Sequence, residues 1–178
     1  MAHIRDDIRM ADPKLPPDFI SELEQSLCPT YECISFQHLT QLEDEPYDSA
    51  HALDSAALGR SFQHAALVYL YRVFCGLPSG DFLVQQHVRS AIDCIAGMGQ
   101  PSKVKKCTLF PLLVAGAHAL SPNLRRRVKD GLDEVYGEIR FECVNVITTE
   151  LQSIWGSDRQ SGSWSDIFEG LNPDILVL

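Results

Sequence analysis

A single histidine in the most apolar segment of the chain is the residue whose chemistry is easiest to name. The segment TLFPLLVAGAHAL covers Thr108 to Leu120, and His118 is its only ionisable side chain. An imidazole has an ordinary pKa of about 6.5, so it can donate a hydrogen bond, accept one or act as a general base. His118 would be the polar group of a pocket, with Tyr69 behind it as a second catalytic residue if the chain is an enzyme. The alternative is a buried histidine that has found a partner.

Gly116 lies two residues before this histidine in the same segment. A glycine inside a helix costs about 0.5–1 kcal/mol relative to alanine, so something should offset that cost. One interpretation is the close approach of a neighbouring helix, and the other is room for a ligand inside a helical bundle. In the second case apolar and aromatic side chains would line the pocket. The candidate ligand-binding residues are Tyr69, Phe74, Phe110, Leu113, Gly116 and His118.

Motifs for metal, nucleotide or nucleophile chemistry are missing from the sequence. His64 and His87 are expected at the boundary of the core, and no two histidines stand four residues apart. The six cysteines form no CxxC pair, and we expect reduced core thiols rather than a zinc site on Cys28 and Cys33. No Gly-x-Ser-x-Gly motif occurs, and Gly97-Met98-Gly99 follows a helical pattern rather than a strand. We therefore expect no metal and no cofactor.

Composition and charge indicate one ordinary globular domain. The chain has 178 residues, of which 45% are hydrophobic and 22% charged, and its formal net charge is −9. This charge argues against a nucleic-acid surface, which needs clustered Lys and Arg. The charged start MAHIRDDIRM is no secretory signal, and no run approaches the roughly 18 apolar residues of a membrane span. We expect an intracellular protein, nuclear or cytoplasmic, with no membrane contact.

Helical spacing of apolar residues runs along most of the chain, and no stretch shows sustained strand-like alternation. We predict an all-α, single-domain bundle of about seven helices. Residues 1–14 are expected to be a flexible N-terminus, and residues 15–178 the helical domain. A first helix starts at Pro16-Pro17, and a weaker one spans residues 34–42. Later helices cover about 54–75, 82–96, 108–120, 122–136, 144–155 and 164–168.

The pattern from Asp54 to Cys75 predicts the central helix, because its second half is apolar almost all round. Arg72 would then have to reach water or pair with a carboxylate. Gly76 should end this helix, and Ser79 or Asp81 should cap the next, which Phe82 would help to line. Thr108 and Ser121 should cap the two helices that follow, and Gly156 should end the helix over 144–155. Three consecutive arginines, 125 to 127, are expected on a solvated face, and the two tryptophans are expected to close the core.

The order of several short segments resembles a known family. These segments are AALVYLYRVFCGLPS, LFPLLVAGAHA, RRRVKDGLDEVYG, IW and WSDIFEG, over residues 65–170. They are similar to the C-terminal part of the fungal-specific transcription factor domain, the helical regulatory region of fungal zinc-cluster proteins. The six-cysteine, basic DNA-binding module of those proteins is absent from this sequence, so direct DNA contact is not implied. Ala117-His118 also stand where the family often has a Cys-Glu or similar pair.

The resemblance implies a regulatory domain that binds an apolar small molecule or a protein partner. It leaves open whether the chain is a fragment of a longer factor or a stand-alone relative. A second hypothesis is a cofactor-independent cyclase or isomerase of fungal secondary metabolism, which would fold a polyketide- or terpenoid-type substrate in an apolar pocket. A third is an interaction module, with an apolar helix face that forms a homodimer.

Overall fold

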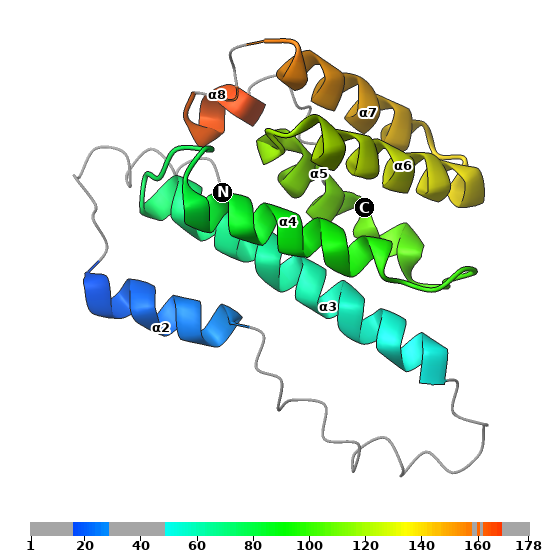
Figure 1. Cartoon of the computed structure of the whole chain (residues 1–178), viewed down its shortest axis with the longest axis horizontal. Coiled ribbons are helices and arrows are strands. Elements are labelled where there is room, and N and C mark those ends of the chain that lie inside the picture. The colour runs from blue at the N-terminus through cyan, green and yellow to red at the C-terminus, as the bar shows by residue number, and fades with distance from the viewer. Residues whose placement is uncertain (1–15, 29–48, 158–159, 161, 169–178) are drawn as a thin grey trace.

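The computed structural model describes residues 16–28, 49–157, 160 and 162–168. Within these residues the chain forms seven α-helices and no strand (Figure 1). The predicted all-α bundle of about seven helices is therefore confirmed. Three subjects of the sequence-based predictions lie outside the described residues: the helix over 34–42, the flexible residues 1–14, and Cys33, which was considered with Cys28 for a zinc site. The helices are α2 (Pro17–Leu27), α3 (Ser49–Tyr69), α4 (Phe82–Ala96), α5 (Leu109–His118), α6 (Pro122–Ile139), α7 (Glu142–Trp155) and α8 (Trp164–Phe168).

The innermost helix of the bundle is α5. It lies between the α3–α4 pair and the α6–α7 pair and contacts all four helices (Figure 1). Every residue from Pro111 to Ala119 is buried. Residues 65–75, which the sequence predicts at the centre, are also largely buried, with Val68 and Leu70 at 0% and 3% exposed, although Val73 is 37% exposed. A short helix that is apolar on every face is the one that needs neighbours all round.

Helix α3 starts five residues before the expected position, at Ser49 rather than at Asp54. Asp54 is not at the helix start but buried inside α3, where its carboxylate accepts a hydrogen bond from the backbone N–H of Gly99 at 2.9 Å. The nearby hydroxyl of Ser102 and the N–H of Gly99 lower the pKa of this carboxyl group. Its partners therefore come from the loop after α4, which no local start signal reveals.

The predicted helix ends depend on local chemistry, and most are confirmed. Asp81 caps α4 by accepting from the N–H of Leu83 at 2.8 Å, and Ser121 caps α6 in the same way. Gly97 and Gly156 follow the last residues of α4 and α7. Gly76 has a φ of 64°, the left-handed conformation that glycine adopts at low cost.

Three expectations about side chains are corrected by the structure. Phe82 is 77% exposed, because it falls off the stripe of α4 on which Val84 and Val88 are buried. Thr108 does not cap α5, since its hydroxyl donates to the carbonyl of Lys105 within the 3-10 helix η3 (Lys105–Thr108). Cys28 and Cys107 are exposed rather than core thiols, although all the described cysteines are free.

Candidate functional site

His118 is the last residue of α5, and its side chain has no exposed surface. Its ring stacks on the indole of Trp164 with the ring centres 5.3 Å apart, and the ring of Phe168 lies edge-on at 6.2 Å. The imidazole Nδ1 lies 3.1 Å from the hydroxyl oxygen of Ser79. His118 is therefore a buried histidine with a partner, held between α5 and the short helix α8.

The hydrogen bonds of Ser79 fix which ring nitrogen of His118 carries the hydrogen. The single hydroxyl hydrogen of Ser79 is donated to the backbone carbonyl of Gln160 at 2.8 Å. Nδ1 of His118 must therefore be the donor to the Ser79 oxygen, since a hydroxyl has only one hydrogen to give. Nε2 is then an unprotonated acceptor, and it has no hydrogen-bond partner among the described residues.

Burial keeps the His118 ring neutral. Removal from water, and to a lesser extent the nearby positive charge of Arg72, lower the pKa of His118 to about 3. The ring is therefore uncharged at neutral pH, and Nε2 can act only as an acceptor of hydrogen bonds.

Backbone carbonyls at the end of α5 accept hydrogen bonds from side chains of four segments. The last carbonyls of a helix have no partner within the helix, so buried ones need donors from elsewhere. Trp155 donates to Gly116, and Gln85 donates to His118, both at 2.8 Å. The amide of Gln160 donates to the carbonyls of residues 117 and 119, and the guanidinium of Arg125 also donates to residue 119. The helix end is thus tied to α4, α6, α7 and the segment before α8.

Arg72 is the only residue of the π-helix η2 (Leu70–Phe74) that carries a charge, and it is 7% exposed. Its side chain is almost wholly buried and pairs with no carboxylate among the described residues, contrary to the sequence-based expectation. Two of its nitrogens donate to the backbone carbonyls of Leu77 and Gly162, while Nε has no partner among the described residues. A π-helix widens the backbone locally and is frequent at functional sites, and here it places the guanidinium in the interior.

The structure brings three of the predicted site residues together around one tryptophan. Tyr69 lies edge-on to Trp164 with ring centres 4.9 Å apart, and to Phe74 at 5.8 Å. His118 stacks on the other side of the cluster, also against Trp164. Phe110 lies apart from this group, 44% exposed and stacked on Phe62 at 5.9 Å.

The remaining two predicted site residues are packed inside the bundle. Leu113 is 1% exposed and belongs to the core. A Cβ on Gly116 would lie 2.8 Å from the side chain of Leu151 on α7 and 2.9 Å from that of Val128 on α6. The missing side chain at Gly116 therefore allows two neighbouring helices to approach closely, which is the first of the two interpretations considered for this glycine.

Sequence reasoning missed several residues of this site. Ser79 was considered only as a helix cap, and Gln85 and Gln160 were not recognised as donors to α5. Arg125 was expected on a solvated face, yet it donates to residue 119 and, at 2.6 Å, to the side chain of Gln160. No local pattern marks these residues, because their partners are distant in sequence.

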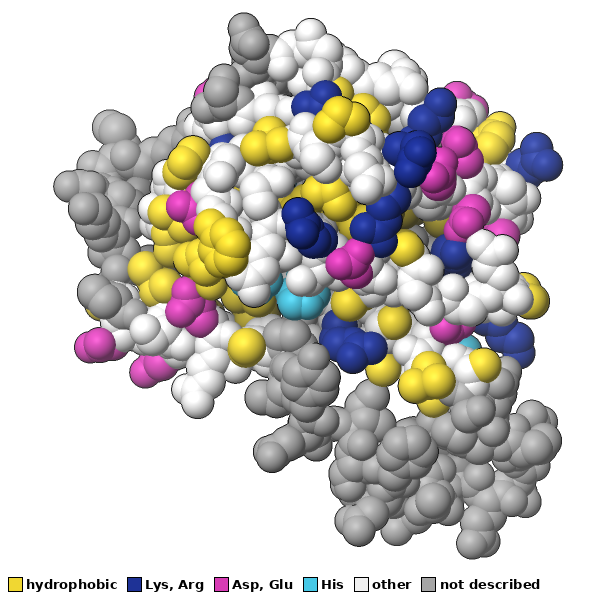
Figure 2. Space-filling model, viewed as in Figure 1, with side chains coloured by type: hydrophobic (Ala, Val, Ile, Leu, Met, Phe, Trp, Pro, Cys, Tyr) yellow, Lys and Arg dark blue, Asp and Glu magenta, His cyan; other side chains and the backbone are white. Residues whose placement is uncertain are grey.

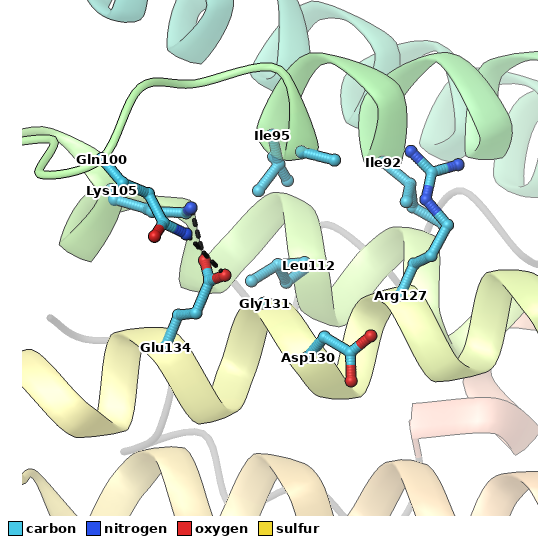
Figure 3. A pocket seen from close by; sticks show the side chains of 10 residues that line it. Ile92, Ile95, Gln100, Lys105, Leu112, Arg127, Asp130, Gly131 and Glu134 are labelled. Atoms are coloured by element: carbon cyan, nitrogen blue, oxygen red, sulfur yellow. Dashed lines mark hydrogen bonds and ion pairs between the residues drawn. The ribbon is translucent and has the colours of Figure 1, made fainter.

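A separate hollow of about 220 Å³ lies on the other side of α5, between α4, α6 and η3 (Figure 3). Its floor is apolar, with Ile92, Ile95 and Leu112, whereas its rim carries Arg127, Asp130 and Glu134. The rim cations are already paired, since Lys105 forms an ion pair with Glu134 and Arg127 with Asp93. None of the predicted site residues lines this hollow, so it is not the pocket that the sequence predicted.

Two histidines expected separately at the core boundary lie in contact. Nδ1 of His64 on α3 and Nδ1 of His87 on α4 are 3.0 Å apart, which makes one of them a donor to the other. Burial, the neighbouring His87 and Arg60 together lower the pKa of His64 to about 4, and burial also lowers the pKa of His87. The hydrogen bond between the two rings links α3 to α4. In the part of the chain that the structure describes, no group of three metal-binding side chains is found.

Lys and Arg side chains lie among Asp and Glu side chains on the face shown in Figure 2, rather than in a patch of their own. Apolar side chains gather on this face over the start of α4 (Figure 2). Phe82, Leu83 and Leu120 are the large exposed apolar residues of this region, at 77%, 39% and 40%. Leu120 lies beside Gly80, just before α4.

The chain belongs to the fungal specific transcription factor domain family, whose family model matches residues 8–178. This match confirms the resemblance noted from the sequence and extends it over nearly the whole chain. Comparisons with curated proteins and with solved structures gave no match. Family membership indicates a regulatory role. Among the helices that the structure describes, none is long and apolar enough to cross a membrane.

Proposed function

We propose that this domain is the ligand-responsive part of a fungal transcription regulator and that it binds an apolar small molecule at the cluster around His118. Tyr69, Phe74 and His118 would contact the ligand, and helix α8 would shift to admit it. The domain would make no direct contact with DNA and would work in the nucleus or cytoplasm. The observation that carries the proposal is the fully buried Nε2 of His118, which lies in a cluster of aromatic rings and has no hydrogen-bond partner among the described residues.

An unpaired polar atom in a protein interior costs free energy, and most such atoms in native proteins are satisfied. A site that binds a ligand is one of the places where such a cost is tolerated, because the ligand supplies the missing partner. The surrounding rings of Tyr69, Trp164 and Phe168 supply apolar surface. The formal net charge of −9 and the interleaved charges in Figure 2 support the absence of direct DNA contact.

Native mass spectrometry of the freshly purified chain tests this proposal. We expect a co-purified apolar molecule that dissociates under mild activation and is lost from a His118→Asn variant. A matched His64→Asn variant, changed at a half-buried histidine outside the cluster, should keep it. A ligand-free wild-type chain that also fails to take up apolar compounds from a fungal extract would contradict the proposal.

The same experiment separates the receptor from the cyclase alternative, which would use His118 and Tyr69 as its polar groups. A receptor returns its ligand with an unchanged mass and structure, whereas a cyclase converts an added polyene or polyketide into an isomer that chromatography resolves. Loss of the isomer in His118→Ala, with the fold intact, would favour the enzyme.

A protein partner is the second candidate, and the exposed apolar side chains Phe82, Leu83 and Leu120 favour it. Exposed apolar clusters of this kind often mark interaction sites. Light scattering after gel filtration should then give the mass of a homodimer, which Phe82→Ser would reduce to that of the monomer. A monomeric wild-type chain would exclude the homodimer.

A further inference from the structure

Two buried polar atoms in the site differ in the partner they need, because one is a hydrogen-bond acceptor and the other a donor. The hydrogen of the His118 ring is on Nδ1, so Nε2 is an acceptor, and within the part of the chain that the structure describes it has no donor. Nε of Arg72 bears a hydrogen for which these described residues supply no acceptor, whereas the other two guanidinium nitrogens bond to carbonyls. Both side chains are more than nine-tenths buried. The site therefore lacks one donor and one acceptor.

The two atoms belong to the same region of the molecule. Arg72 donates to the carbonyl of Gly162, and two residues later Trp164 stacks on the His118 ring. The charge of Arg72 is also close enough to lower the pKa of His118. The segment Gly162 to Phe168, which we name the strap, covers both side chains.

Resting on the proposed function, we infer that the ligand is a neutral, aromatic or similarly apolar molecule with a hydroxyl group. The hydroxyl donates its hydrogen to Nε2 of His118, and its oxygen accepts from Nε of Arg72. The apolar body takes the place that the Trp164 ring now occupies between His118 and Tyr69, so the strap has to move when the ligand binds.

Other polar groups fit this pair of atoms less well. A carboxylate accepts hydrogen bonds but has no hydrogen for His118. An ammonium group donates but offers no lone pair to Arg72, and a second positive charge beside a buried guanidinium would be repelled. A hydroxyl supplies one donor and one acceptor from a single atom.

Calorimetric titration with two probes that differ only at the oxygen tests the inference. The probes are 2-naphthol and 2-methoxynaphthalene, whose fused rings resemble the indole of Trp164 in size. The proteins are the wild-type chain and Trp164→Ala, in which the ring is removed from the site. We expect Trp164→Ala to bind 2-naphthol about tenfold more tightly than it binds 2-methoxynaphthalene, because the ether has no hydrogen to donate to Nε2. The wild-type chain should bind 2-naphthol more weakly, since its strap must first move.

Substitutions of His118 and Arg72 show which side chain is responsible for any preference for 2-naphthol over the ether. In His118→Asn the amide nitrogen can still donate to Ser79, but nothing replaces Nε2. Added to Trp164→Ala, it should make the two probes bind alike. Arg72→Lys keeps the positive charge and removes Nε–H, and it should reduce the preference. His64→Asn is the matched control and should leave it unchanged.

Each result has a distinct meaning once circular dichroism has shown that the variants are folded. Equal binding of both probes to Trp164→Ala would overturn the hydroxyl inference while leaving the apolar site of the proposed function intact. Binding of neither probe would overturn both. Wild-type binding as tight as that of Trp164→Ala would overturn the role of the strap. A crystal structure of the naphthol complex with a water, rather than the hydroxyl, on Nε2 would also overturn the inference.

Discussion

The close approach of α6 and α7 to Gly116 predicts that Gly116→Ala destabilises the domain. The added methyl carbon would lie 2.8 Å from Leu151 and 2.9 Å from Val128, against ordinary carbon–carbon contacts of about 3.5–4.0 Å. Overfilling of a packed core costs about 1–3 kcal/mol. Alanine regains about 1 kcal/mol of helix propensity over glycine. We therefore expect the free energy of unfolding to fall by about 1 kcal/mol.

Gly137→Ala is the matched control, because Gly137 lies inside α6 and a Cβ there meets nothing within 4 Å. The same substitution should raise the stability at this position by about 0.5–1 kcal/mol, through helix propensity alone. The two variants should thus differ by about 2 kcal/mol. For a chain of this length, 1 kcal/mol corresponds to about 2–4 °C in Tm.

Urea unfolding followed by circular dichroism, with thermal scans beside it, measures both variants. A Gly116→Ala chain that is as stable as Gly137→Ala would refute the reasoning. It would mean that the space beside Gly116 can accept a methyl group, as expected if this glycine makes room for a ligand.

Three further predictions concern the helix ends and the histidines. Gln160→Ala leaves two buried carbonyls at the end of α5 short of a donor and should cost about 2 kcal/mol, and an unchanged urea midpoint would argue against that role. Asp81→Ala removes the cap of α4 and should cost about 1 kcal/mol, whereas Asp81→Asn should cost much less; equal losses would count against the cap. The folded-state pKa values of His118 and His64, about 3 and about 4, lie below their unfolded value of 6.5. The unfolded chain then binds more protons, so stability is fully present above pH 6.5 and falls as the pH drops towards 4; urea midpoints that stay constant over that range would contradict this.

The helix ends could be predicted because their signals are local. Asp81, Ser121 and Gly76 each act on backbone groups within a few residues, so the sequence alone contains the relevant chemistry. The start of α3 was predicted wrongly because a residue that looks like a local signal bonds to a distant group. Asp54 is a typical capping residue, but its carboxylate is used by Gly99, 45 residues away.

The location of the candidate site could be predicted only in part. His118 and Tyr69 were identified from residue type and from the apolar segments that hold them, and the structure brings both into contact with Trp164. Gln160 could not be identified, because its partners at the end of α5 lie more than 40 residues earlier in the chain. The sequence shows that the charged Arg72 lies in an apolar helix and needs partners, but it does not show which groups these are. The carbonyl that Arg72 reaches is 90 residues away, and no periodic pattern encodes such a contact.

If the domain binds its ligand as proposed, Nε2 of His118, which has no hydrogen-bond partner among the described residues, sets stability against response. Replacement of the imidazole by an apolar side chain of similar volume would remove an unsatisfied atom from the interior and so strengthen the resting fold. It would also erase the acceptor by which, under the proposed function, the domain would distinguish one apolar molecule from another. Selection for thermal robustness alone should therefore enrich variants at this position that no longer respond.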